Sequence, residues 1–173
     1  MKQIIHKIFH RMKQDSLAKK TAERKRTKQY PELTAVKSCL VVWSANDRQE
    51  EYLKSLRKKL PQAKWDKICF LPEGYQADLL RDVVYVKEEE LGFGGKILNE
   101  KLPVLLDKEY DLLVDLSEVS NVMLNFILTN SLAKCKAGMK KESFDADLMI
   151  DGETGVLKFI DKLFEVLAKL KKY

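Results

Sequence analysis

Short, continuous runs of apolar residues, separated by segments with helical spacing, constrain the fold of this chain more than any other feature. The clearest run is Leu-Leu-Val at 112–114, which stands between two aspartates. Runs without polar alternation are typical of parallel strands that are buried on both faces. Six predicted strands follow from this pattern, at residues 38–43, 67–71, 82–86, 111–115, 135–139 and 148–150.

The segments between and after these runs carry the signals of helices. Asn46 and Asp47 can cap the first helix of the series, and Ser120 can cap a later one. The expected helices cover residues 48–60, 98–108, 121–133 and 154–171. Strands that alternate with helices predict βαβ units, so we expect a single Rossmann-like three-layer α/β domain with a mostly parallel sheet.

The positive charge of the chain is concentrated at its N-terminus. The 173 residues have a net charge of +6, yet residues 1–30 hold ten Lys/Arg and only two acidic residues. Apolar residues recur there at helical spacing, and helix formers continue to Lys28 before Tyr30-Pro31 ends the segment. The apolar stripe consists of Ile4, Ile5, Ile8, Phe9 and Met12. We expect a basic amphipathic helical arm at 1–30 and the α/β domain at 31–173.

Three interpretations of this arm stay open. The apolar stripe with its flanking basic residues resembles an interfacial helix on an anionic membrane. The basic residues can instead contact the phosphates of RNA, as in a ribosome-associated protein. Alternatively, the stripe folds back onto the domain and the charges face solvent. The candidate anion or membrane surface consists of Lys19, Lys20, Arg24, Lys25, Arg26 and Lys28.

The sequence indicates a cytoplasmic protein, with the arm as a contact to the inner membrane in the first of these interpretations. The longest uncharged stretch, residues 119–133, is too short to span a bilayer, and the N-terminus lacks the unbroken apolar region of a signal peptide. Cys39, Cys69 and Cys135 are odd in number and have no CxxC spacing. We interpret them as free, buried thiols and expect no metal site.

A ligand site is expected where the chain reverses its direction across the sheet. In doubly wound α/β sheets, ligands bind outside the carboxyl ends of the strands at this switch point. The candidate ligand-binding residues there are Ser44, Asn46, Asp47, Asp115, Ser117, Glu118 and Asn121. Asp115 has two interpretations, either as a base or ribose ligand, or as an acceptor for the free N–H groups of the next helix.

A glycine cluster at 91–96 offers a second candidate, an anion site formed by Gly94, Gly95 and Lys96. Its spacing fits neither template for phosphate binding. A P-loop requires Ser or Thr at the position of Ile97, and a dinucleotide fingerprint requires a third glycine there. We therefore favour a flexible turn between a strand and a helix.

Histidine chemistry is excluded from the α/β domain, because His6 and His10 are the only histidines and both lie in the arm. A Ser/His/Asp or Cys/His triad cannot be built without a third one. The i, i+4 spacing of the two histidines lacks the acid of a metalloprotease helix and is flanked by Lys7 and Arg11. We expect no catalytic residues and no cofactor.

Two resemblances rest on the segments Tyr-Asp-Leu-Leu-Val-Asp-Leu at 110–116 and Ala-Lys-Cys-Lys-Ala-Gly at 133–138. With the basic arm, the Gly-Lys pair and Asp-Leu-Met-Ile-Asp at 147–151, the chain resembles an uncharacterised family of small bacterial proteins, a domain of unknown function. That resemblance implies no activity. More distantly, residues 111–138 resemble the N-terminal, acceptor-side half of heptosyltransferase-type glycosyltransferases, whose nucleotide-sugar half has no counterpart here.

These observations favour a non-catalytic binding or adaptor module, peripheral to the membrane if the arm binds lipid. An RNA- or ribosome-associated protein is one alternative. A sugar- or nucleotide-binding protein related to half of a glycosyltransferase is the other.

Overall fold

A six-stranded, all-parallel sheet forms the centre of the protein. The computed structural model describes residues 3–5, 8, 24–76, 78–93, 96–142, 146–151 and 155–170. Within them the strands are β1 (Ser38–Ser44), β2 (Lys64–Phe70), β3 (Val84–Val86), β4 (Leu112–Asp115), β5 (Lys136–Met139) and β6 (Leu148–Ile150). Their order across the sheet is β3-β2-β1-β4-β5-β6. The predicted α/β fold with a parallel sheet is confirmed.

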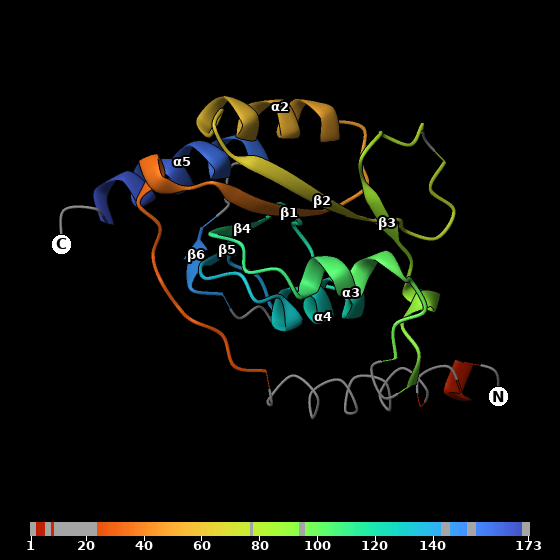
Figure 1. Cartoon of the computed structure of the whole chain (residues 1–173). Coiled ribbons are helices and arrows are strands. Elements are labelled where there is room, and N and C mark those ends of the chain that lie inside the picture. The colour runs from red at the N-terminus through yellow and green to blue at the C-terminus, as the bar shows by residue number, and fades with distance from the viewer. Residues whose placement is uncertain are drawn as a thin grey trace.

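Helices cover both faces of this sheet (Figure 1). Within the described part of residues 31–173, the helices are α2 (Gln49–Lys59), α3 (Lys101–Leu106), α4 (Val122–Asn130) and α5 (Val156–Leu170), and the 3-10 turns are η1 (Leu33–Ala35) and η2 (Glu88–Glu90). Helices α2 and α5 pack on one face, while α3 and α4 pack on the other. The four helices expected within the α/β domain are therefore present, with ends that differ by a few residues.

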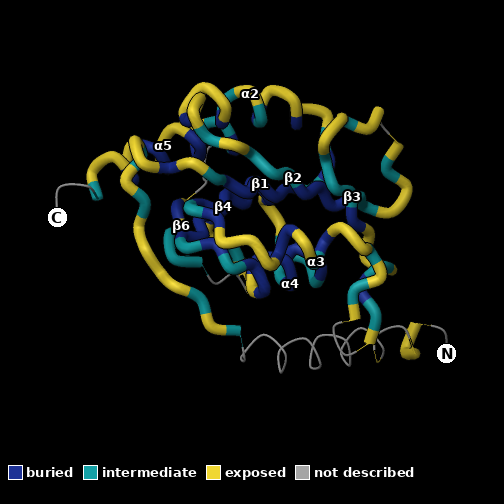
Figure 2. The backbone as a smooth tube through the Cα atoms, viewed as in Figure 1, coloured by how far each residue is buried: buried dark blue, intermediate teal, exposed yellow. Residues whose placement is uncertain are grey.

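The apolar run of β1 is unbroken because both faces of this strand are buried. Cys39, Val41 and Trp43 contribute to the core beneath α2 and α5, whereas Leu40 and Val42 contribute to the core beneath α3 and α4. Neighbouring side chains of a strand point to opposite faces, so a strand with two covered faces needs apolar residues at every position. Figure 2 shows this burial along the middle of the sheet and exposure along the outer sides of the helices.

The chain leaves β1 first toward β2 and β3, and then returns to add β4, β5 and β6 on the other side. Both β2 and β4 pair with β1 in parallel, and Val42 lies opposite Ile68 on one side and Asp115 on the other. The switch point is therefore the gap between the carboxyl ends of β1 and β4.

The expected helical arm does not extend to Lys28. Residues 24–30 have no regular secondary structure, although Gln3–Ile5 and Ile8 are helical. Residues 9–23 of the arm, with Lys19 and Lys20, lie outside the described residues. Arg24 instead pairs with Asp107 at the end of α3, so the last part of the arm lies against the domain.

Arg26 anchors this segment. Its guanidinium donates to the carbonyl oxygens of Ala133 and Lys134, both at 3.1 Å, and to Asp147 Oδ1 at 2.7 Å. Burial alone would raise the pKa of Asp147, but the hydrogen bonds from Arg26 and from the Lys136 N–H outweigh it and hold that pKa below its usual value. Arg26 is thus paired with a carboxylate of the domain, and its assignment to an anion or membrane surface stays a prediction.

Among the described residues, no helix combines the length and the apolar character needed to cross a bilayer.

We expect Arg26→Ala to lower the free energy of unfolding by about 2 kcal/mol, because it leaves the largely buried Asp147 without its main partner. Urea unfolding followed by circular dichroism measures this loss. Arg24→Ala is the matched control, since its exposed pair with Asp107 contributes at most about 1 kcal/mol. Equal losses for the two variants would contradict the anchoring role of Arg26.

The same anchor predicts a pH dependence. A carboxylate whose pKa is lower in the folded state stabilises the fold above its unfolded pKa of about 3.9, and this contribution is lost as the pH falls through the folded pKa. The stability difference between the wild type and Asp147→Asn should therefore be full at pH 7 and should shrink on acidification below about pH 4. A difference that stays constant down to pH 2 would show that Asp147 is not held by its charge.

Candidate binding cleft at the switch point

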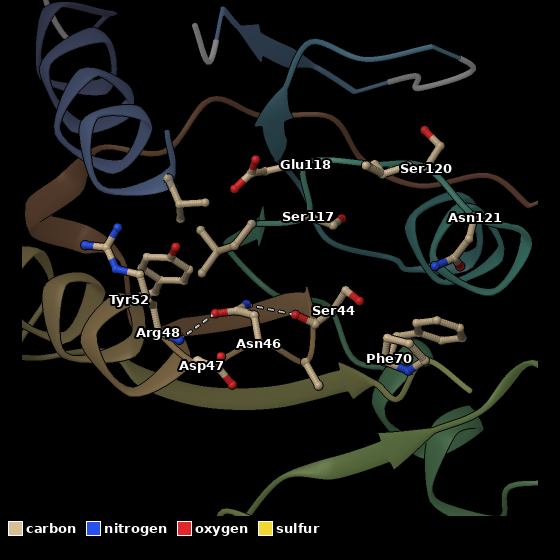
Figure 3. Close-up of a pocket in the computed structure, with 15 residues that line it drawn as sticks. Ser44, Asn46, Asp47, Arg48, Tyr52, Phe70, Ser117, Glu118, Ser120 and Asn121 are labelled. Atoms are coloured by element: carbon tan, nitrogen blue, oxygen red, sulfur yellow. Dashed lines mark hydrogen bonds between the residues drawn. The ribbon is translucent and has the colours of Figure 1, made fainter. Parts of the chain in front are cut away.

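An open cleft of about 590 Å³ lies at the carboxyl ends of β1 and β4 (Figure 3). One wall is the segment after β1, and the other is the segment between β4 and α4. Of the ligand-binding residues predicted from the sequence, those that line the cleft are Ser44, Asn46, Asp47, Ser117, Glu118 and Asn121. The structure thus brings together six side chains that are separated by up to 77 positions in the chain.

The wall after β1 is held by a compact turn. Asn46 donates from Nδ2 to the carbonyl of Ser44 at 2.9 Å and accepts the Arg48 N–H at Oδ1, also at 2.9 Å. Asn and Asp favour such turns because their side chains reach their own backbone two residues away. This turn precedes α2, so Asn46 closes the loop ahead of the helix and does not cap it in the expected manner.

The wall after β4 is fixed at both ends. Leu116 N–H donates to Val42 O at 2.8 Å, which continues the ladder between β1 and β4 by one residue. At the other end Asn121 caps α4, because its Oδ1 accepts the Leu124 N–H at 2.8 Å. The expected cap, Ser120, donates instead to the carbonyl of Glu142 at 2.6 Å.

Asp115 does not face the cleft, which corrects both sequence-based interpretations. Its side chain is 0% exposed and forms an ion pair with Lys141, itself 5% exposed. Asp115 also accepts hydrogen bonds from the N–H and the hydroxyl of Ser117. It therefore neither caps α4 nor lines the cleft, and Lys141 balances its charge inside the protein.

Lys141 completes this buried cluster, and the sequence analysis missed it. Its Nζ donates to the carbonyl oxygen of Ser117 at 2.8 Å and to the Ser117 hydroxyl at 3.0 Å. Asp115 lies opposite Gly138 in the sheet, so a lysine three residues beyond Gly138 reaches the same edge. The position of Lys141 just after β5 could have indicated this contact, but only if the pairing of β5 with β4 had been known.

Two carboxylates remain uncompensated at the cleft. Asp47 and Glu118 are both exposed, and neither forms an ion pair with any described residue. The lining also contains the cation Arg48, but its Nε lies 2.8 Å from Glu51 Oε2 and its guanidinium lies 5.6 Å from the centre of the Tyr52 ring. The cleft therefore contains two carboxylates that have no cation partner among the described residues, and one cation that is already paired with Glu51.

Apolar side chains form the rest of the lining, and the sequence analysis did not assign them to a site. They are Ala45, Tyr52, Phe70, Pro72, Leu116, Val119 and Val156. Val119 stands out because its side chain is exposed although it belongs to the cleft wall. A cleft with an apolar wall and a few polar groups is the usual form of a small-molecule site.

The glycine cluster lies apart from this cleft. Lys96 is exposed and is absent from the cleft lining, and its carbonyl oxygen accepts the Gly92 N–H at 2.7 Å in a tight loop. Gly94 and Gly95 lie outside the described residues. The anion site expected at this loop stays a prediction.

Some of the described basic residues at the end of the arm form ion pairs with the domain, and one does not. Lys28 is exposed and lies 3.6 Å from Asp147 Oδ1, while Lys25 is exposed without a partner among the described residues. Arg24 and Arg26 are engaged with the domain, as described above. Part of the expected cationic surface therefore compensates acidic groups of the protein itself.

The thiols offer no reactive group. Cys39, Cys69 and Cys135 are free and buried, as expected, and burial raises the pKa of each to about 12. A thiolate is the reactive form, and almost none is present at neutral pH. Among the described residues, no group of three or more His, Cys, Asp or Glu side chains could hold a metal ion.

Comparison with known proteins matches residues 10–170 to the family of unknown function DUF6913. The chain belongs to this family. The match includes the whole α/β domain up to the end of α5, so the cleft lies inside the part that defines the family. No curated protein and no solved structure matches the chain. The resemblance to half of a heptosyltransferase and the bacterial origin stay predictions.

We expect Lys141→Met to lower the free energy of unfolding by about 3–5 kcal/mol, because Asp115 would remain buried without its cation. Chemical unfolding measures the loss. Lys108→Met is the matched control, since the pair of Lys108 with Asp66 is half exposed and contributes at most about 1 kcal/mol. The double variant Asp115→Leu/Lys141→Met should recover most of the loss, and a Lys141→Met variant as stable as the control would contradict this cluster.

Proposed function

We propose that this member of the DUF6913 family is a binding module that holds a small polar molecule in the cleft between β1 and β4. The observation that carries the proposal is the position of the cleft. It lies at the switch point of a doubly wound sheet, where such folds bind their ligands. Its volume is within the range of small-molecule sites.

The side chains support binding better than catalysis. The lining contains no histidine, cysteine or lysine, so none of the residues that form the cleft could activate its serines as a histidine would. Asp115, the carboxylate at the end of the central strand, is neutralised by Lys141. A general base must come within hydrogen-bond reach of the proton that it removes, and Asp115 is buried and does not line the cleft. We therefore favour a non-catalytic role.

Ser44 provides a direct test of this proposal. Its hydroxyl lies in the gap between the turn after β1 and the N-terminus of α4 (Figure 3). Ser44→Phe should fill the cleft and abolish binding while the fold persists. The probes are adenosine, guanosine, cytidine, uridine, glucose and the monophosphate of each.

With the wild type, we expect at least one of these compounds to raise the melting temperature by roughly 3–6 °C at ten times its Kd. Ser44→Phe should show no shift, whereas Thr129→Phe on the exposed side of α4 should respond as the wild type does. The absence of a shift with every probe, or an equal shift in Ser44→Phe, would overturn the proposal.

A second candidate function is peripheral membrane binding through the arm. It rests on the exposure of Ile4, Ile5 and Ile8, whose exposed fractions are 63%, 47% and 53%. Lys2, Lys7 and Arg11 flank these residues in the sequence. Exposed isoleucines between basic residues fit the interface of an anionic bilayer better than RNA, which favours aromatic side chains for stacking.

Flotation with vesicles of phosphatidylglycerol and phosphatidylcholine tests this second function. We expect Ile4→Asn/Ile5→Asn/Ile8→Asn to reduce the bound fraction at least about tenfold, since three buried apolar side chains are lost. The control replaces three other exposed apolar residues, Leu79, Leu98 and Val104, by Asn. Equal binding of both triple variants would contradict membrane docking, and so would retention of nucleic acid in moderate salt with no flotation.

A further inference from the structure

We propose that the cleft selects hydroxyl-bearing ligands without a phosphate group and that Asp47 and Glu118 set this selectivity. The inference rests on the proposed binding function and specifies the ligand class. It follows from the charges and the backbone N–H groups at the two helix N-termini that border the cleft.

The N-terminus of α2 is poorly suited to a phosphate. In dinucleotide-binding folds, a glycine-rich turn after the first strand brings the pyrophosphate onto the N–H groups of the following helix. Here residues 44–49 contain no glycine. The N–H groups of Arg48 and Gln49 already donate to Oδ1 and to the carbonyl of Asn46.

Carboxylates near the N-terminus of α2 make the binding of a phosphate there still less favourable. Glu50 and Glu51 occupy the first turn of the helix, and Asp47 precedes it. Carboxylates near a helix N-terminus satisfy the positive end of the helix dipole. An incoming phosphate would therefore find the dipole compensated and would be repelled by Asp47, which lines the cleft.

The N-terminus of α4 is also poorly suited to a phosphate. Asn121 supplies the cap from its own side chain, and the Asn125 N–H donates to the Asn121 carbonyl at 2.9 Å. Glu118 precedes the cap by three residues and lies in the cleft wall. Both helix N-termini at the cleft thus have a carboxylate close by, Asp47 before α2 and Glu118 before α4, and α4 is also capped by Asn121.

No cation in the lining is free to offset these charges. Arg48 is paired with Glu51, and Lys141 is buried against Asp115. Asp47 and Glu118 are exposed and have no cation partner in the part of the chain that the structure describes. Carboxylates accept hydrogen bonds, and the hydroxyl groups of a ribose or a sugar ring donate them. The apolar side of such a ring suits the wall formed by Tyr52, Phe70 and Pro72.

The test compares each neutral compound of the panel with its own monophosphate. Titrations of isotope-labelled protein, followed by the amide NMR signals of residues 44–48 and 116–121, give the two Kd values. In the wild type we expect the phosphate to bind at least about tenfold more weakly than the neutral partner. Because screening weakens repulsion between exposed charges, this ratio should fall at 0.5 M salt.

Asp47→Asn, Glu118→Gln and the double variant should bring the two Kd values together, the double variant most completely. Glu109→Gln is the matched control, since Glu109 is exposed and precedes β4, at the end of the strands opposite to the cleft. Melting curves without ligand verify that the variants are folded. A ratio that is unchanged in the double variant would overturn the assignment to Asp47 and Glu118.

The outcomes separate this inference from the proposed function. If the phosphates bind as tightly as the neutral compounds or more tightly, and Ser44→Phe abolishes both, the cleft is a ligand site and the inference is wrong. If no compound of the panel binds, the proposed function is rejected and the inference with it.

Discussion

The structure depends on one constraint, the burial of β1 on both faces and along both edges. Its side chains alternate between the two cores, and its backbone pairs with β2 on one side and β4 on the other. Helices must therefore cover both faces, and the chain must leave β1 in two directions. The gap that opens where these directions diverge is the cleft, so the fold itself creates the candidate site.

Charged groups inside the domain are consistently paired. Lys141 balances Asp115, and Arg26 balances Asp147. Buried Lys136 donates to the carbonyl oxygens of Leu128 and Thr129 near the C-terminus of α4, where the helix dipole favours a cation. Asp47 and Glu118 differ from these buried groups because they are exposed at the cleft and form no ion pair with any described residue, so a ligand in the cleft could reach them.

Most elements of the fold could be predicted, because periodicity is a local property of the sequence. The run at 148–150 is a strand with the predicted ends, and Phe159, Ile160 and Leu163 of α5 are buried as expected. Capping was less predictable. Ser120 and Asn121 are neighbours and both are good caps, so the choice of Asn121 depends on a contact of Ser120 with Glu142, which is distant in the sequence.

The sequence by itself determined the succession of strands and helices along the chain, the absence of histidine from the domain and the location of the excess positive charge. It also indicated Ser44, Asp47 and Glu118 as residues that follow strands. Only the tertiary structure decided that Asp115 is buried against Lys141, that Arg26 is turned inward and that Tyr52 and Phe70 join the cleft. These outcomes depend on strand order and register, which bring distant segments together, and no local pattern encodes such contacts.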